Sequence, residues 1–396
     1  MTSRMRRVIR WIHALGCLPL MLAVPTATAG ANSDEEGVPS LSVTSLPAYG
    51  TSQNLVACAS NVDVASHHVA ALLFLEGAGW WEKPVDAAPC TTLNSNGCFT
   101  VDVTTGGCDA YATEYALYLL PIGHACPIVH GAAVPPAELE TDSVARLRTP
   151  RNPYLDALLP FAGRGWVRRD SRCPAGPGPN YFSPGNVFVD GAGRLHLALT
   201  PRAQGGWAGG EVWLPAPLGH GEYRIHTIGR IDLLDPQAVF GIFTWDRDAP
   251  PAYRELDIEL SRWGNVGDPN NAQFVVQPPS GADNPHRFPI DLDDGDSALT
   301  HVIDWQPGSV TFAVYHGHHF GALPAAELIE QHTVSDASVP TAGDAAFRLN
   351  LWLANGQPPQ SGLAQEVVVS YFAFELIFTD GFESGDPSAW AGAEPH

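Results

Sequence analysis

Polar and apolar residues alternate over several short stretches in the first part of the chain. Between residues 41 and 147, runs such as LSVTSL, NLVACAS, VAALLFL and CFTVDVTT are separated by Gly, Pro, Asn and Asp. Short alternating or apolar runs that are bounded by turn residues are typical of β-strands. The sequence therefore predicts a β-sandwich domain over residues 41–147.

A second set of strand patterns covers residues 163–378 and includes LHLALT, GEYRIHTI, AVFGIFTW, ELDIEL and FRLNLWL. No long helical pattern interrupts them, which favours a large two-sheet β-jelly roll whose curved face forms a groove. The stretch TPRNP lies between the two sets and predicts a linker over residues 148–162. The predicted fold class is thus all-β, with an N-terminal β-sandwich followed by a jelly roll.

The two ends of the chain have a different composition. Residues 1–29 contain four arginines, no acidic residue and an apolar run from Leu18 to Val24, followed by Ala27-Thr28-Ala29. This layout is typical of a bacterial secretory signal peptide, and the apolar run is too short to span a bilayer. We expect a secreted or periplasmic protein with a polar leader at 30–40 and a polar C-terminal tail at 379–396.

The formal net charge is −21 over 396 residues, and removal of the signal peptide makes the remaining chain more negative. Such a charge disfavours nucleic acid and anionic membrane surfaces as partners, whereas a neutral polymer is unaffected. No later apolar stretch is long enough to cross a membrane.

Six cysteines follow the signal peptide: Cys58, Cys90, Cys98, Cys108, Cys126 and Cys173. In an oxidising compartment they are expected to form disulfides, and their spacing alone allows 15 connectivities. Five of them lie in the first domain, and an odd number cannot pair within itself. We therefore predict two disulfides within the first domain and one that joins this domain to Cys173.

The stretch YRELDIELSRWGN at 253–265 places three acids at two-residue spacing, Glu255, Asp257 and Glu259, with apolar residues between them. Successive side chains of a strand point to opposite faces, so the three carboxyls share one face. The pattern is compatible with a solvated acidic strand. It is also compatible with catalysis, because two carboxyls can divide acid and nucleophile roles when their environments separate their pKa values.

Several stretches of residues 163–378, in this order, resemble glycoside hydrolase family 16, the laminarinase and lichenase type of concanavalin A-like sandwich. They are FSPGNVFVDGAGRLHLALT (182–200), WAGGEVW (207–213), GHGEYRI (219–225), GIFTW (241–245), ELDIEL (255–260), DWQPGSVTFAV (304–314) and LNLW (349–352). The resemblance implies that Glu255 is a nucleophile, that Glu259 is a general acid and then base, and that Asp257 tunes the charge between them.

The resemblance also implies a set of substrate-binding residues: Glu211, Phe243, Trp245, Tyr253, Gln277, Asn350 and Trp352. For Phe243 and Trp245, an ordinary place in the sandwich core is the alternative. Trp263 has the parity of the glutamates and would floor the groove if the strand continued. Arg254, Trp213 and Val275 differ from the residues usual in the family, so no particular polysaccharide is transferred.

The function predicted from these features is a secreted, retaining, endo-acting hydrolase of a β-linked polysaccharide, with transglycosylation as a further activity. The alternatives are a lectin-like binding protein without catalysis and a structural surface protein. We expect a monomer that needs no cofactor and has no catalytic metal, and the family resemblance is compatible with a structural calcium ion. The histidines of YHGHHF (315–320) are assigned to a polar hairpin turn.

Overall fold

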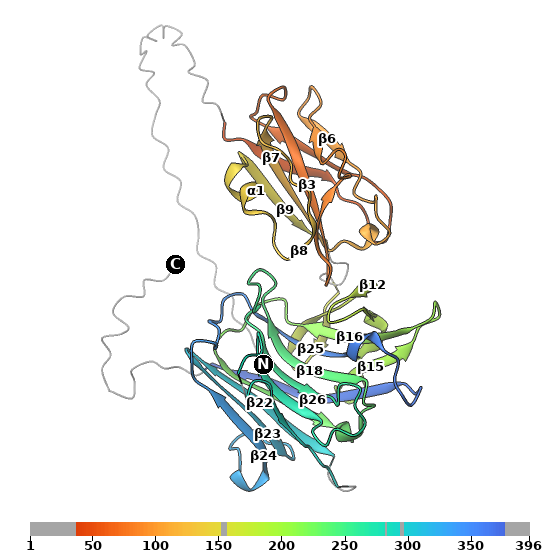
Figure 1. Ribbon diagram of the computed structural model, residues 1–396, viewed down its shortest axis with the longest axis vertical. Helices are drawn as coiled ribbons and strands as arrows, with labels where there is room; N and C mark the ends of the chain where they lie inside the picture. The colour runs from red at the N-terminus through yellow and green to blue at the C-terminus, as the bar shows by residue number, and fades with distance from the viewer. Residues whose placement is uncertain (1–36, 152–156, 282, 294–296, 377–396) are drawn as a thin grey trace, which may run out of the picture. The chain divides into compact units, whose positions relative to one another are not determined.

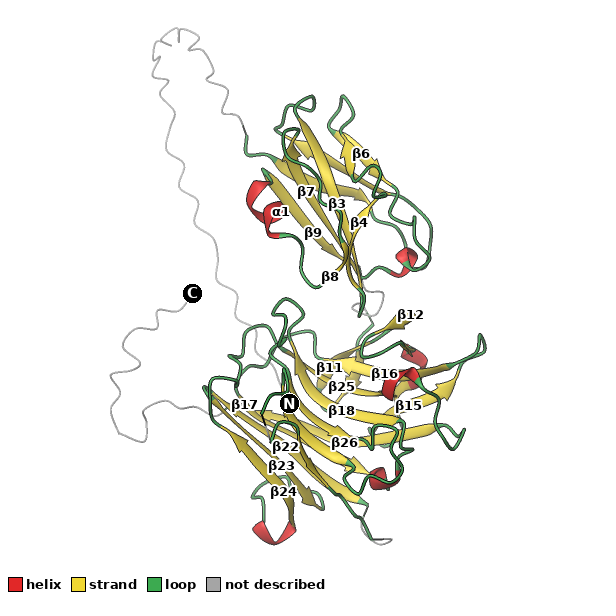
Figure 2. Cartoon of the chain, viewed as in Figure 1, coloured by secondary structure: helices red, strands yellow, loops and turns green. Residues whose placement is uncertain are grey.

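The computed structural model describes residues 37–151, 157–281, 283–293 and 297–376. The predicted signal peptide and C-terminal tail lie outside these residues, as does most of the predicted leader. Strands dominate the described part, whose one α-helix is the six-residue α1 (Ala137–Asp142); the other helical segments are short 3-10 turns (Figure 2). The all-β prediction is confirmed. No helix among the described residues is long and apolar enough to cross a membrane.

The strands fall into two sets along the chain. The first set is β1 (Ser40–Ser45), β2 (Leu55–Ser60), β3 (His67–Leu75), β4 (Gly79–Lys83), β5 (Cys90–Thr92), β6 (Cys98–Val101), β7 (Glu114–Pro121), β8 (His130–Ala132) and β9 (Ala145–Pro150). The second set is β10 (Leu159–Phe161), β11 (Arg164–Arg168), β12 (Ser171–Ala175), β13 (Asn180–Phe182), β14 (Val187–Val189), β15 (Leu195–Pro201), β16 (Trp207–Trp213), β17 (Gly221–Ile228), β18 (Ala238–Trp245), β19 (Leu256–Leu260), β20 (Ala272–Val276), β21 (His286–Phe288), β22 (Ala298–Gln306), β23 (Ser309–His316), β24 (Leu328–Val334), β25 (Ala346–Leu353) and β26 (Gln365–Glu375). The 3-10 turns are η1 (Asp109–Tyr111), η2 (Pro184–Asn186), η3 (Ile231–Leu233), η4 (Ala325–Glu327) and η5 (Ala354–Gly356).

The first set folds into a β-sandwich. One sheet has the order β1-β2-β6 and the other has the order β8-β4-β3-β7-β9. Buried residues of both sheets, such as Leu55, Val69 and Leu117, form the core between them. The opposite face of β3 and β7 packs in a second cluster that includes Trp80 and Leu139 of α1. Apolar residues on both faces explain why the β3 run is continuously hydrophobic rather than alternating.

The second set folds into two packed layers. One layer contains β16, β25, β18, β19, β20 and β21 in this order, and the other contains β14, β15, β26, β17, β22, β23 and β24 (Figure 1). A single large core separates them and takes residues from both, such as Ile225 of β17 and Ile258 of β19. This arrangement confirms the predicted jelly roll. The outer face of the first layer is therefore free to form a site.

The segment between the two folds is shorter than the sequence suggests. Strand β9 ends at Pro150 and β10 begins at Leu159, so both extend into the range 148–162 that was assigned to a linker. Arg151 is buried beside β9, and its guanidinium donates to the carbonyls of Pro47, Ala110 and Ala112. These bonds anchor the end of the first fold.

Three disulfides are present, and they confirm the predicted pattern. Cys58 pairs with Cys98 and Cys90 pairs with Cys126, both within the first sandwich. Cys108 pairs with Cys173 of β12, over a sequence separation of 65 residues. The parity of the cysteines was therefore a correct guide to the cross-link between the two folds.

We predict that the double variant Cys108→Ser/Cys173→Ser unfolds more easily, because the disulfide no longer restricts the unfolded chain. A loop of this length corresponds to about 2–4 kcal/mol of unfolding free energy. Denaturant unfolding of the variant and the wild-type protein measures the difference. An unchanged free energy of unfolding would contradict the prediction.

Candidate active site

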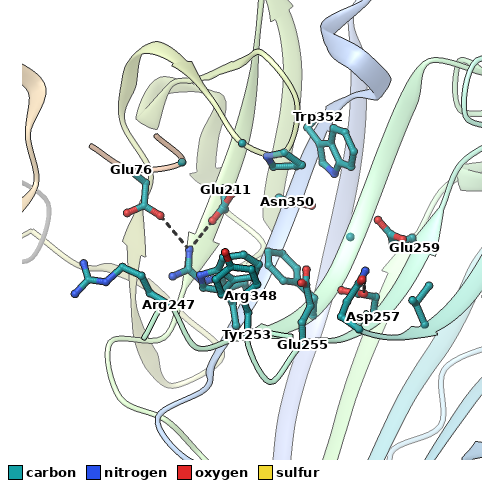
Figure 3. A pocket seen from close by; sticks show the side chains of 18 of the residues that line it. Glu76, Glu211, Arg247, Tyr253, Glu255, Asp257, Glu259, Arg348, Asn350 and Trp352 are labelled. Carbon is teal, nitrogen blue, oxygen red and sulfur yellow. Dashed lines mark hydrogen bonds and ion pairs between the residues drawn. The ribbon is translucent and has the colours of Figure 1, made fainter. Parts of the chain in front are cut away.

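Strand β19 places the acidic residues opposite the core. Leu256 and Ile258 are fully buried in the jelly-roll core, so Asp257 and Glu259 project from the other face of the strand. Glu255 lies one residue before β19, and its carbonyl accepts the backbone N–H of Gln277 at 3.1 Å. All three carboxyl groups line one cavity (Figure 3).

This cavity has a volume of about 640 Å³, within the usual range for small-molecule sites. It brings together every residue that the sequence nominated: Glu211, Phe243, Trp245, Tyr253, Glu255, Asp257, Glu259, Trp263, Gln277, Asn350 and Trp352. Their chemical roles stay predictions; the structure shows only that these residues line the same cavity.

The register of the first layer arranges the lining residues in rows across the strands. One row pairs Glu259 with Gln273 on one side and with Gly241 on the other, and Gly241 in turn pairs with Asn350. The next row contains Asp257, which pairs with Phe243 and Val275. The row of Glu259 thus contains two side-chain amides, those of Gln273 and Asn350. The neighbouring row, that of Asp257, contains the aromatic ring of Phe243.

Burial changes the protonation of all three acids. Loss of solvent raises the pKa of Glu259 to about 7. Burial also raises the pKa of Asp257 well above its usual range, and the charges of Glu255 and Glu259 raise it further. The pKa of Glu255 is raised as well, first by burial and then by Glu259. Repulsion between the carboxylates thus raises these pKa values less than desolvation does.

Burial keeps a proton on Asp257 well above the usual pKa of an aspartate. Its side chain is hydrogen-bonded to Glu255, a bond that raises the pKa of Asp257 and lowers that of Glu255. A protonated Asp257 that donates to an ionised Glu255 explains both directions. The amide of Gln277 donates to Oδ2 of Asp257 at 3.1 Å. Asp257 is therefore suited to stabilise a negative charge on Glu255.

Gln273 is a site residue that the sequence analysis missed. Its amide N–H donates to Glu259 at 2.8 Å, and its amide oxygen accepts from Trp263 at 3.2 Å and from Arg287 at 2.8 Å. The bond to Glu259 lowers the pKa of that carboxyl and so opposes the effect of burial. Gln273 has the same parity along its strand as Val275 and Gln277, which the family resemblance pointed to, so strand alternation could have added it to the set.

A network of arginines and glutamates forms another part of the cavity. Glu211 is fully buried and accepts from Arg169 at 2.7 Å and from Arg348 at 2.9 Å. Arg348 is also 3.8 Å from Glu76 of the first sandwich (Figure 3). The two arginines hold the pKa of Glu211 below its usual value despite its burial. Glu211, nominated as a sugar contact, is thus engaged with both arginines.

Two aromatic pairs line the cavity. The rings of Trp245 and Tyr253 stack with centroids 4.1 Å apart. Those of Trp263 and Trp352 meet edge to face at 5.8 Å. Trp263 does not lie on an extended strand, because β19 ends at Leu260 and Trp263 adopts a positive φ of 51°. It reaches the cavity from a turn, which the parity argument could not foresee.

Asn350 has an unused hydrogen-bond acceptor. Its side-chain oxygen is buried and has no hydrogen-bond partner among the described residues. A Cβ at Gly241 would lie 2.5 Å from this oxygen, so only glycine leaves room for it. A buried unpaired acceptor is costly unless a ligand or water satisfies it. The side chain is therefore available to a bound hydroxyl group.

Arg254 points away from the carboxyls, as its parity predicts. Its guanidinium donates to Asp246 at 2.9 Å and to the carbonyl of Thr341 at 3.0 Å. It is not among the cavity-lining residues. The acids of β19 are thus not neutralised by the arginine that precedes them.

No protein-family model and no curated protein matches the chain. Solved structures with some similarity include a β-glucanase of Bacillus licheniformis, with 18% identity over 54% of this chain and 92% of that chain and a TM-score of 0.40. Another is a β-1,3-glucanase of Mycobacterium marinum, with 20% identity over 57% and 99% and a TM-score of 0.39. A pseudo β-1,3-glucanase of Mycobacterium tuberculosis has 22% identity over 54% and 93% and a TM-score of 0.39.

We predict that Asp257→Asn stabilises the folded protein at pH 8. A carboxyl whose folded-state pKa exceeds its unfolded-state value contributes less stability as the pH rises above the unfolded value. Asparagine removes this penalty and can keep both hydrogen bonds, so the free energy of unfolding of the variant should exceed that of the wild type at pH 8. Thermal unfolding at pH 4 and pH 8 checks this, since the gain should shrink at pH 4. A variant that is less stable than wild type at pH 8 would contradict it.

Proposed function

We propose that this chain is a secreted glycoside hydrolase that cleaves internal bonds of a neutral, β-linked polysaccharide with retention of configuration. The main support for the proposal is that the carboxyls of Glu255, Asp257 and Glu259 line one cavity. The stacked rings of Trp245 and Tyr253 and the unpaired side-chain oxygen of Asn350 line the same cavity. Retaining glycosidases need two carboxyl groups on opposite sides of the scissile bond, one ionised and one protonated.

In the first step, ionised Glu255 attacks the anomeric carbon of the bound sugar. The bond from this carbon to the leaving oxygen breaks, and protonated Glu259 transfers its proton to that oxygen. The raised pKa of Glu259 keeps the proton available near neutral pH. The hydrogen bond from Asp257 lowers the pKa of Glu255 and so favours the ionised form that the attack requires, whereas burial and the charge of Glu259 raise this pKa.

In the second step, water attacks the anomeric carbon of the glycosyl-enzyme ester. Ionised Glu259 takes a proton from this water, and the bond to Glu255 breaks so that its carboxylate is restored. Two displacements at the same carbon return the original configuration. A sugar hydroxyl in place of water would give transglycosylation by the same route.

The charges of the cavity favour an uncharged glycan. Each arginine among the described lining residues is already ion-paired: Arg169 and Arg348 with Glu211, and Arg247 with Glu114 at 2.7 Å. The ionised carboxylate of Glu255 would repel sulfate or uronate groups. The stacked Trp245 and Tyr253 offer an apolar face for a sugar ring.

Export is supported by two observations. Residues 1–29 have the pattern of a signal peptide. Three disulfides are typical of proteins that fold in an oxidising compartment. A polysaccharide too large to enter the cell would then meet the enzyme outside the cytoplasm.

Glycan binding without cleavage is a second candidate, and one observation favours it. Burial and the charge of Glu259 raise the pKa of Glu255 itself, and a protonated Glu255 cannot attack. Release of reducing ends from a panel of β-glucans and galactans separates the two functions. Binding without release, unchanged by Glu255→Gln, would establish the binding protein and reject the hydrolase.

We predict that Glu259→Gln lowers kcat/KM on the cleaved polysaccharide by about 10²–10⁴-fold, because the leaving oxygen receives no proton. The loss should be much smaller on a dinitrophenyl glycoside, whose leaving group needs no proton, whereas Glu255→Gln should abolish both activities. Initial rates on the two substrates test this assignment. An equal loss on both substrates in Glu259→Gln would contradict the role of general acid.

We predict that Gln273→Met moves the basic limb of the kcat/KM profile to higher pH. The Gln273 hydrogen bond lowers the pKa of Glu259, so its loss raises this pKa and keeps the acid protonated longer, by about one pH unit. The control is Gln331→Met, an exposed position outside the cavity. A shift to lower pH, or the same shift in the control, would contradict the role of Gln273.

A further inference from the structure

The turn between β3 and β4 of the first sandwich reaches the cavity that holds the catalytic carboxyls. Glu76, Gly77 and Ala78 of this turn line the same cavity as Glu255 and Glu259. The described residues of both sandwiches, from Pro39 on, belong to the same compact unit. We propose that the first sandwich supplies a wall of the glycan-binding groove, formed by the turn 76–79 and Gly131, and that this wall contacts sugar units next to the catalytic centre. This inference rests on the proposed function.

The wall is joined to the catalytic layer by an ion pair. Glu76 lies 3.8 Å from Arg348 of β25 (Figure 3). Arg348 pairs in register with Phe243, which in turn pairs with Asp257. The side chain of Glu76 is about one-fifth exposed, so one of its oxygens can accept a sugar hydroxyl while the other faces Arg348.

A close backbone approach sets the position of the turn. The N–H of Gly176 donates to the carbonyl of Gly77 at 3.3 Å. A Cβ at Gly77 would lie 2.3 Å from that nitrogen, and Gly77 has a positive φ of 74°. Only glycine satisfies both the conformation and the distance. The turn is thus built to sit against the jelly roll.

Three further links keep the wall in place. Arg247 binds Glu114 at 2.7 Å, and its guanidinium lies 4.5 Å from the ring centroid of Phe74. The hydroxyl of Tyr49 donates to the carbonyl of Asp170 at 3.1 Å. The disulfide from Cys108 to Cys173 adds a covalent link. Because ionic, aromatic and covalent contacts hold the wall, moving it to fit a glycan would cost free energy. The wall can therefore discriminate between glycans of different shape.

The consequence concerns which glycans fit. Ala78 and Gly79 present little side-chain bulk toward the cavity, while Glu76 presents a carboxylate. The wall therefore leaves space for an unsubstituted sugar unit and hydrogen-bonds its hydroxyls, but repels an anionic substituent. The wall limits the path of the glycan at this side of the groove. It therefore determines which glycosidic bond of an oligosaccharide is cleaved.

The experiment uses the full chain with Ala78→Trp, which fills the space in front of the wall. We expect KM for the cleaved β-glucan to rise at least tenfold and the cleavage positions on end-labelled oligosaccharides to shift, with the melting temperature unchanged. Ala87→Trp is the matched control, because Ala87 is exposed in the same sandwich and does not line the cavity. Glu76→Gln is a milder second variant that keeps the shape and should raise KM about two- to fivefold.

The outcomes separate the two proposals. One outcome is that the wild-type protein cleaves the glucan while both Ala78→Trp and Glu76→Gln keep its kinetics and cleavage positions. That result would reject the proposed role of the wall and leave the proposed hydrolase function standing. If the wild-type protein binds the glucan without cleaving it, calorimetry of Ala78→Trp should still show at least tenfold weaker binding. A wild-type protein that neither binds nor cleaves any glycan of the panel would reject the proposed function and the wall together.

Discussion

The candidate active site depends on the burial of three carboxyl groups beside the core of the jelly roll. Strand β19 is held on one face by Leu256 and Ile258 in the core, and this anchorage forces its acids into a confined cavity on the other face. Desolvation then raises the pKa of each acid, more than their mutual repulsion does. The chemistry of the site is therefore a consequence of how the strand packs.

The surrounding polar groups limit the cost of that burial. Gln273 and Gln277 each donate one hydrogen bond, to Glu259 and Asp257 respectively. The buried Glu211 is balanced by Arg169 and Arg348. Unpaired buried charges destabilise a fold by several kcal/mol, so these partners are as much a part of the structure as of the site.

The first sandwich has its own core and contacts the jelly roll through polar and backbone groups. Its core is built from its own two sheets and is separate from the core of the jelly roll. Its polar and backbone contacts, from Tyr49, Gly77 and Glu114, instead bring one turn to the edge of the cavity. Contacts of this kind orient a neighbour without merging two hydrophobic cores.

The sequence by itself determined the two β-folds, the face on which Glu255, Asp257 and Glu259 lie, and the need for a disulfide to Cys173. Each of these follows from the two-residue period of a strand or from the odd number of cysteines in the first domain, and none of them requires knowledge of distant contacts. Tertiary structure alone decided the pairing of Gln273 with Glu259, the turn that carries Trp263, the arginines around Glu211 and the approach of Glu76. These depend on strand register and on packing between segments far apart in the chain, which a local pattern does not encode.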